Sequence, residues 1–442
     1  MKEQLENIIK RASIYGADAC DLVINAGESL NLSAQGGKLE KYKLAKTSSL
    51  GIRVIKNNRI GLSYTESMDD DAVNFALKSS IENAQFADIN LHETINVKNS
   101  ADLVFKSIHP ADTSSIEEKI EFALKLENEV YKRDSRVKAV PYNGLSSSSS
   151  QSFYMNSLGT YTEDQDHYLS AYSSALIQDG PLSSMHYAPI MGRKLSELDL
   201  NECIEESLLH SRNWLEAKPV ATGKYDVLFS TEVLSEILHA FSSCFSAKDA
   251  IDKINPWEHN LGKKMAHEGL TLIDSPKFKD AFYKYNFDFE GVIKKDLTLI
   301  ENGVLKNFYH NTATASFYKT QSTGHATRGT RSSLNVSGSN LVISPGSMSD
   351  SDVQEGTYLE VIDVMGIGPG SDSISGEFSF GASGYLCKNG KRIQPVKGVT
   401  IAGNFNNLIN DIGPIGKTLH HNHSQTTFSP LIKFLNLSVA GS

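Results

Sequence analysis

The sequence is poor in cysteine and has no long apolar segment. Its 442 residues include four cysteines, and no two of them have the CxxC spacing of a redox or metal motif. A secreted chain of this length usually carries more, so a reducing compartment is expected. No apolar run approaches the roughly 20 residues that cross a bilayer, and residues 1–18 lack the apolar stretch of a signal peptide. We predict a cytoplasmic location and no membrane association.

Positive charge is also scarce. The 43 lysines and arginines are outnumbered by 52 aspartates and glutamates, so the formal net charge is −9. Binding to phosphate groups needs a basic face, and a nucleic-acid partner is therefore not expected. Hydrophobic residues make up 40% of the chain, as in ordinary globular proteins. A chain of 442 residues is longer than one compact core needs, so we expect two or three domains.

Residues 1–100 are predicted to form a first α+β domain. Apolar residues at helical spacing begin the chain, and Gly16 follows as a stop signal. Another helix is predicted over residues 70–86. Between the helices lie four short alternating runs, which predict a meander of short strands. The breaks between these runs are Gly27, Gly36-Gly37, Ala45-Lys46 and the hairpin signal Asn57-Asn58.

Residues 101–217 are predicted to form a middle α+β region. Ser114-Ser115 ahead of Glu117-Glu118 is an N-cap signal for a helix. The five serines Ser146–Ser150 lie between strand-like segments, which favours an exposed strand edge or loop over a flexible linker. A further helix near residues 195–217 closes the region.

Residues 218–442 are predicted to form a β-rich C-terminal domain with one helix near residues 230–247. Alternating segments flank Asn302-Gly303 and Asn389-Gly390, and both pairs favour the type I′ turn of a hairpin. The predicted fold class is therefore α+β. The N-terminal region should contain an antiparallel sheet with helices, and the C-terminal domain an antiparallel sheet that is curled or barrel-like.

Three local sequences resemble functional motifs without completing them. Gly413–Thr418 reads GPIGKT, but a phosphate-binding loop needs glycine where Asp411 stands. His267-Glu268 is not part of HExxH, because residue 271 is threonine. The cluster His420–His423 has no carboxylate or cysteine at ligand spacing, so a solvated polar loop is favoured over a metal site.

Longer segments spread along the chain carry a family resemblance. The N-terminal ones are GADACDLVINAGESLNLSAQGGKLEKYK and SSLGIRVIKNNRIGLSYT, and the middle one is YMNSLGTYT. Those of the C-terminal half are LTLIENGVLKNFYHNTATA, STGHATRG, GEFSFGASGYL, GVTIAGN and SPLIKFLNLSVAG. Together they resemble the TldD/PmbA family of metalloprotease-related proteins, once called modulators of DNA gyrase. The resemblance covers essentially the whole chain and implies a role in proteolysis or peptide processing.

The catalytic branch of that family carries HExxxH on the helix that corresponds to Ser230–Ala247. A cysteine before Gly-Lys near the C-terminus is its third ligand, and the glutamate takes the proton of a zinc-bound water. In this chain His239 stands at the first histidine position of the motif. Ala240 stands at the position of the glutamate, and Cys244 stands at the position of the second histidine. Ile415 replaces the third ligand. The resemblance therefore implies no catalytic residue, metal or cofactor in this chain, with His239 and Cys244 as the remaining candidate ligands.

This pattern resembles the PmbA/TldE branch, whose members lack the metal site. It implies a non-catalytic subunit that pairs with a TldD-like catalytic subunit, which would hold the zinc; a homodimer is open when the chain is alone. Strand edges of the pair would hold unfolded peptides by backbone pairing. The Gly- and Ser-rich stretches supply the candidate residues of the peptide cleft: Ser322, Gly324, His325, Arg328, Gly376 and Ser379.

Two other functions stay open at this point. An active metallopeptidase would use His239, Cys244 and a third donor, for which His310, His325 and His420–His423 are candidates. The missing glutamate argues against it, because a general base contributes roughly 10²–10⁴-fold to the rate. The other alternative is a non-enzymatic, homodimeric regulatory or binding protein.

Overall fold

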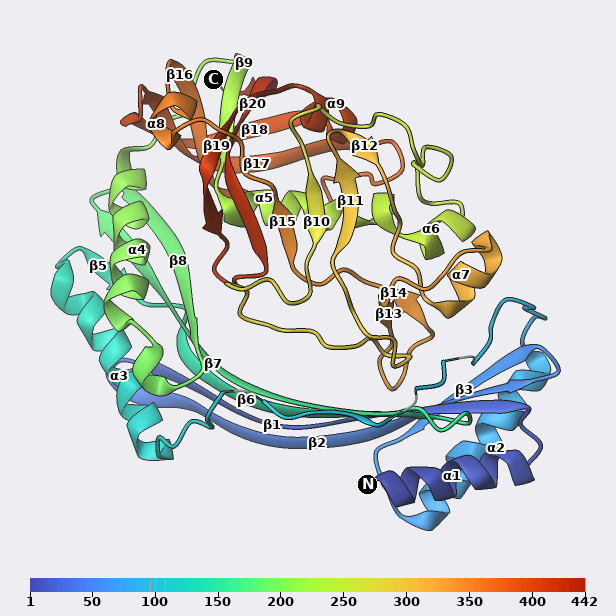
Figure 1. The fold of residues 1–442 in the computed structure, drawn as a ribbon. Helices are drawn as coiled ribbons and strands as arrows, with labels where there is room; N and C mark the ends of the chain where they lie inside the picture. The colour runs from blue at the N-terminus through green and yellow to red at the C-terminus, as the bar shows by residue number, and fades with distance from the viewer. Residues whose placement is uncertain (96, 100, 108, 442) are drawn as a thin grey trace.

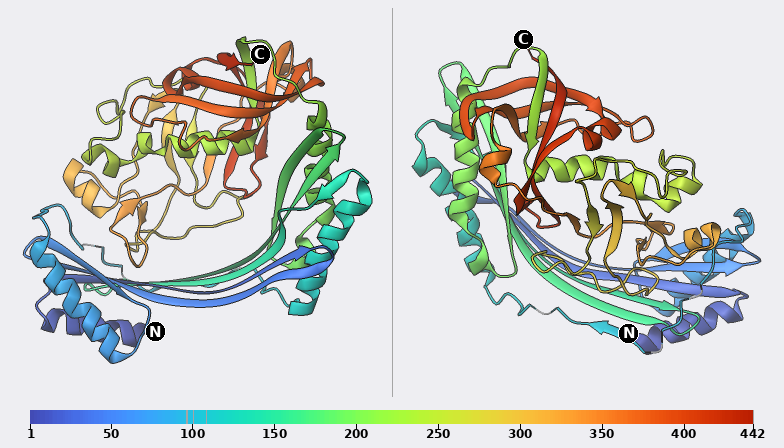
Figure 2. Two further views of the ribbon diagram at one scale, coloured as in Figure 1. Left: turned by 180° about the vertical axis from the view of Figure 1, so that it is seen from behind. Right: turned by 45° about the horizontal axis from the view of Figure 1, so that its top comes forward.

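The computed structural model describes residues 1–95, 97–99, 101–107 and 109–441. Residues 1–217 build a long curved sheet with helices on its outer side, and the remainder builds a β-rich C-terminal unit on the concave side (Figure 1). Figure 2 shows from behind how the sheet curves around that unit. The α+β class predicted from the sequence is confirmed. Within the described residues, no helix is long and apolar enough to cross a membrane.

Eight strands form the curved sheet. They are β1 (Ala19–Gln35), β2 (Lys38–Lys56), β3 (Arg59–Thr65), β4 (Leu103–Phe105), β5 (Val137–Ala139), β6 (Asn143–Asn156), β7 (Tyr161–Asp179) and β8 (Leu182–Gly192). Their order is β3-β2-β1-β6-β7-β4, and β5 and β8 also pair with β7. All pairs are antiparallel except β4–β7. Because β1 pairs with β6, residues 1–100 and 101–217 contribute to one continuous sheet.

Helices cover the two ends of the sheet and leave its middle bare (Figure 1). At one end lie α1 (Lys2–Ile14) and α2 (Asp70–Phe86); at the other lie α3 (Ile116–Arg133), α4 (Leu200–Asn213) and the short 3-10 turns Leu195–Glu197 and Trp214–Glu216. The helix predicted over residues 70–86 is confirmed. So is the N-cap of α3, where the Ser115 hydroxyl accepts from Glu118 N and the Glu118 carboxylate accepts from Ser115 N.

Two predictions for this sheet were wrong. The four short strands are two long ones, since β1 continues through Gly27 and β2 through Ala45-Lys46. Gly27 is not a break but a point of close approach, where a Cβ would lie 2.8 Å from the carbonyl oxygen of Ser149. The serine run is neither an edge nor a loop, because Ser146–Ser150 lie in β6 and pair with both β1 and β7. Serines fit there because no helix covers the middle of the sheet.

Five strands of the C-terminal unit close into a ring, because β9 pairs with both β16 and β20. They are β9 (Gly223–Phe229), β16 (Thr357–Met365), β17 (Glu377–Lys388), β18 (Lys391–Asn404) and β20 (Thr427–Ala440). The barrel-like architecture is confirmed, but the sheet is mixed, since β9–β16 and β15–β20 are parallel. Added strands are β10 (Leu272–Asp274), β11 (Leu297–Glu301), β12 (Val304–Leu305), β15 (Leu341–Ile343) and β19 (Ile412–His421).

The remaining elements of this unit are short. They are α5 (Thr231–Ala240), a 3-10 turn (Ser242–Phe245), α6 (Ala247–Ile251), α7 (Thr312–Tyr318), β13 (Ala326–Thr327), β14 (Asn335–Val336), α8 (Asp350–Val353) and α9 (Phe405–Asn410). Both hairpins predicted from Asn-Gly pairs are present. Asn302 and Gly303 have φ of 49° and 78°, and Asn389 and Gly390 have 49° and 75°, as a type I′ turn requires.

A buried ion network joins the curved sheet to the C-terminal unit. Arg53 on β2 is 1% exposed and donates from Nε to Asp21 Oδ2 on β1 at 2.9 Å. Arg328 of the C-terminal unit places Nη1 2.7 Å from Asp21 Oδ1. Glu290, also of that unit, lies 3.5 Å from Arg53 Nη2. The carboxylate of Asp21 thus contacts the guanidinium groups of both Arg53 and Arg328 across the junction. Because all three side chains are buried, water does not take the place of this carboxylate.

The variant Asp21→Ala is expected to destabilise the protein. It leaves Arg53 and Arg328 buried with less counter-charge, and breaking a buried pair costs about 3–5 kcal/mol. Unfolding in guanidinium chloride should therefore show a lower midpoint. The exposed pair of Lys2 and Asp102 provides the control, because Asp102→Ala should barely move the midpoint. Equal midpoints for both variants would show that the network does not stabilise the fold.

Candidate functional site

The helix α5 separates two clefts, one within the C-terminal unit and one between that unit and the curved sheet. The Ser230 hydroxyl caps it by accepting from Val233 N at 3.3 Å. Its buried stripe (Val233, Leu234, Ile237 and Leu238) packs into the core. The helix ends at Ala240, and a 3-10 turn follows from Ser242. Side chains near its two ends therefore face different surroundings.

The first cleft, of about 490 Å³, lies at the C-terminal end of α5. One wall is α5 with the turn after it, including His239 and Ser242, and the opposite wall is the extended segment 335–339. Tyr309 and Thr426-Thr427 complete it. Most of these side chains are small and polar. The cleft is therefore lined mainly by hydroxyl and backbone groups, with Asp249 as its acidic side chain.

Buried Asp274 fixes the wall formed by residues 335–339. Its carboxylate accepts from Ser339 N at 2.6 Å, from Tyr309 Oη at 3.1 Å and from His325 Nε2 at 3.2 Å. Burial would raise the pKa of Asp274, but the hydrogen bonds from His325 and Ser339 lower it, so the group is a carboxylate. Gly338 permits this packing, since a Cβ there would lie 2.7 Å from Tyr309 Oη. The wall is thus held in one conformation.

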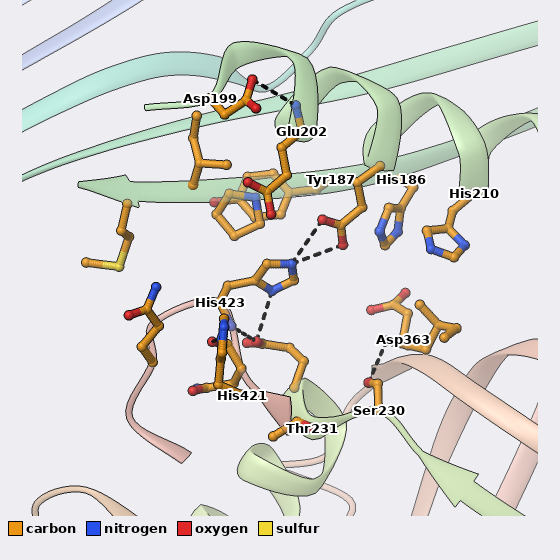
Figure 3. A pocket seen from close by; sticks show the side chains of 18 of the residues that line it. His186, Tyr187, Asp199, Glu202, His210, Ser230, Thr231, Asp363, His421 and His423 are labelled. Atoms are coloured by element: carbon orange, nitrogen blue, oxygen red, sulfur yellow. Dashed lines mark hydrogen bonds and ion pairs between the residues drawn. The ribbon is translucent and has the colours of Figure 1, made fainter. Parts of the chain in front are cut away.

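The second cleft, of about 500 Å³, lies at the N-terminal end of α5 (Figure 3). It is bounded by β8 and α4 of the sheet unit and by α5, β16 and the loop between β19 and β20. Its lining is acidic: Glu197, Asp199, Glu202, Glu206, Glu232, Glu236 and Asp363. This cleft therefore differs from the first in charge as well as in place.

His423 crosses the second cleft and links the two units. Its Nε2 lies 3.0 Å from Glu206 of α4, and its Nδ1 lies 2.9 Å from Glu232 of α5 (Figure 3). Burial would lower the pKa of His423, but the two glutamates raise it to about 10. Burial lowers the pKa of the neighbouring His186 and His210 to about 4. At neutral pH His423 is thus an imidazolium, whereas His186 and His210 are neutral.

Comparison with known proteins identifies the family. Models of three family domains match in order: PmbA/TldA metallopeptidase domain 1 over residues 20–84, the central domain over 109–208 and the C-terminal domain over 222–441. The chain belongs to the PmbA/TldD family. The metalloprotease PmbA of Escherichia coli O157:H7 is 24% identical over 409 residues, which span 91% of this chain and 88% of the relative. A metalloprotease of Methanocaldococcus jannaschii is 25% identical over 430 residues, spanning 93% and 92%.

Solved structures of other proteins share the fold. A Thermotoga maritima protein described as a modulator of DNA gyrase superposes with a TM-score of 0.87 at 24% identity, covering 99% of both chains. TldE from Thermococcus kodakarensis superposes with a TM-score of 0.83 at 20% identity, covering 99% of this chain and 100% of its own. At these identities the likeness concerns the fold alone.

The positions of the PmbA/TldD metal motif differ in their surroundings in this chain. His239 is exposed to the first cleft, whereas Cys244 is 2% exposed within the hydrophobic core. Burial raises the pKa of Cys244 to about 12, so it is a thiol and not the thiolate that binds metals. Ile415 on β19 belongs to the same core. These residues do not fit a catalytic zinc ion, and Ala240 offers no carboxylate beside His239.

Each histidine considered as a third donor has another partner. His310 Nδ1 lies 3.2 Å from Thr314 Oγ1, His325 contacts Asp274, and His420 Nε2 lies 3.0 Å from Asp350. The cluster His420–His423 is not a solvated loop as predicted, because His423 is bound between two glutamates from elements distant in sequence. In the part of the chain that the structure describes, no three His, Cys, Asp or Glu side chains could hold a metal ion.

The residues predicted to line a peptide cleft lie in two separate places. Ser322, Gly324, His325 and Arg328 flank β13 in the segment between α7 and β14, while Gly376 and Ser379 lie at β17 of the barrel (Figure 1). His325 is fully buried and Arg328 is 4% exposed, so their side chains support the fold. The polar wall is the neighbouring segment 335–339, which sequence reasoning missed although Ser337-Gly338-Ser339 has the same small-residue composition.

The variant His423→Ala is expected to lower stability in a pH-dependent way. Since the folded-state pKa of about 10 exceeds the ordinary 6.5, the contribution is complete below pH 6.5 and disappears as pH rises through 10. His423 also lowers the pKa of Glu206 and Glu232, so the contribution weakens again below about pH 4.5. We expect a loss of about 2 kcal/mol near pH 6.

Thermal and denaturant unfolding between pH 5 and 10 measures this effect. His259→Ala is the control, because that side chain is 85% exposed. A constant difference between wild type and His423→Ala at every pH would contradict the charged bridge.

Proposed function

We propose that this chain is a TldE-like, non-catalytic subunit of a two-chain metalloprotease acting on unfolded peptides. One observation carries the proposal: of the four motif positions, only His239 presents a ligand to the cleft. Ala240 lacks the carboxylate that would take a proton from water. Cys244 and Ile415 belong to the hydrophobic core. The role of this chain would then be to bind and position the substrate.

The cleft at the C-terminal end of α5 is the place we assign to the peptide. Residues 335 and 336 of this wall pair with β13, and Ser337 N donates to the carbonyl oxygen of His325, so the wall is one strand of a small two-stranded sheet. An extended peptide can pair with such a segment through its backbone, which makes recognition largely independent of side chains. The hydroxyl groups of Ser242 and Thr426 offer further hydrogen bonds. A TldD-like partner would supply the zinc ion, the glutamate and the hydrolysis.

Metal analysis tests the non-catalytic role. We expect the purified chain to hold well under one zinc per molecule and to hydrolyse no unfolded peptide alone. A double variant, Ala240→Glu with Cys244→His, should not gain zinc, because position 244 lies in the core. About one zinc per wild-type chain, lost in His239→Ala, would overturn the proposal. Co-expression with a TldD-like chain should give a one-to-one complex with zinc in the partner; a lone homodimer would favour a regulatory protein.

A cleft-filling variant tests peptide binding separately. Ser242→Tyr places a large ring in the first cleft and should reduce proteolysis by the assembled pair at least tenfold without preventing assembly. Ser183→Tyr is the matched control, since Ser183 is exposed and lines neither cleft. Equal activities of the two variants would show that the peptide binds elsewhere.

A further inference from the structure

More than half of β2 is an open edge of the curved sheet. β1 pairs with β2 along its whole length, but β3 pairs only with Leu50–Lys56. Among the residues that the structure describes, the stretch 38–49 thus has a strand neighbour on one side only. All but two of these twelve residues are exposed. The unpaired N–H and C=O groups of such an edge are able to bind another strand.

The two faces of this edge differ in chemistry. Tyr42 and Leu44 stand opposite Leu32 and Leu30 of β1, so they extend the apolar face that α3 covers. They are 47% and 51% exposed. Lys41 and Lys43 stand opposite Ser33 and Asn31 on the polar face. An incoming strand would therefore meet Tyr42 and Leu44 on one face and the ammonium groups of Lys41 and Lys43 on the other, while Lys46 lies on the first face, opposite Glu28.

Charge decides which strand fits. Lys38, Lys41, Lys43 and Lys46 form no ion pair with any residue that the structure describes, and Glu40 is the one acidic residue of the stretch. A second copy of this edge would add four more lysines, and like charges on paired strands are destabilising. The rest of the chain is strongly acidic, given a total net charge of −9. Edge lysines discourage self-association, and the same charges attract an acidic segment.

We propose that residues 38–49 of β2 form a docking edge for an extended segment of another polypeptide in which acidic and apolar residues alternate. Its backbone would add a strand to the sheet. Its acidic side chains would lie beside Lys41 and Lys43, and its apolar side chains beside Tyr42 and Leu44. The residues of the docking edge line neither cleft, so this inference is independent of the proposed subunit role.

Binding of labelled peptides tests the docking edge. The probe is an eleven-residue peptide of alternating glutamate and valine, and the result expected from fluorescence anisotropy is saturable binding. A lysine–valine peptide of the same length should not bind. A glutamate–valine peptide that is N-methylated throughout keeps its charges but donates no backbone hydrogen bond, so it should not bind either. Equal binding of the methylated peptide would overturn strand addition.

Charge reversal locates the binding. The double variant Lys41→Glu, Lys43→Glu should weaken binding of the glutamate–valine peptide about tenfold and allow the lysine–valine peptide to bind. The control, Lys10→Glu with Lys391→Glu, makes the same change in net charge at two exposed sites elsewhere. Equal weakening in both double variants would show general electrostatic attraction and overturn the docking edge. If the wild type bound no peptide, the lysines would serve only to prevent strand pairing, and the proposed docking edge would be overturned.

Discussion

Asp21 shares its carboxylate between Arg53 of the sheet and Arg328 of the C-terminal unit, and the placement of that unit depends on this contact. Two buried guanidinium groups cannot lie side by side without a carboxylate, because each charge has lost its water. Burial and the negative charge of Asp288 raise the pKa of the nearby Glu290 carboxyl group to about 7. The positive charge of Arg53 lowers this pKa, but by less than the other two effects raise it. The carboxylate of Asp21 is therefore the group that holds both arginines at the junction.

His423 provides a second connection, at the far end of the sheet. Arg328 holds the C-terminal unit near the end covered by α1 and α2, while His423 joins α5 to Glu206 of α4 at the other end (Figure 1). Two connections far apart resist rotation better than one. The helix α5 lies between these two connections and forms one side of each cleft. The connections therefore also fix the position of the two clefts. The orientation of α5, and with it the position of His239, thus depends on the packing of its buried stripe and on the bond between Glu232 and His423.

Features set by neighbouring residues were predictable from the sequence, and features set by distant ones were not. The Ser115 cap, the helix over residues 70–86 and the Asn-Gly turns depend on local geometry, and all are present. The lengths of β1 and β2 were missed because Gly27 reads as a break until the approach of Ser149 is known. The role of His423 was missed for the same reason, since its partners lie about 200 residues away.

The loss of the metal motif is a matter of packing as well as of ligand chemistry. A missing general base needs one substitution, and Ala240 at the end of α5 is half-buried, so it is less enclosed than the two lost ligand positions. Position 244 differs: the turn after α5 directs Cys244 into the core, where its burial keeps it a thiol. Position 415 is likewise a core position of β19. A histidine at 244 would have to lose water and displace apolar neighbours before it could bind an ion. Two ligand positions therefore contribute to the stability of this chain, and that contribution opposes a metal site whatever residue stands at 240.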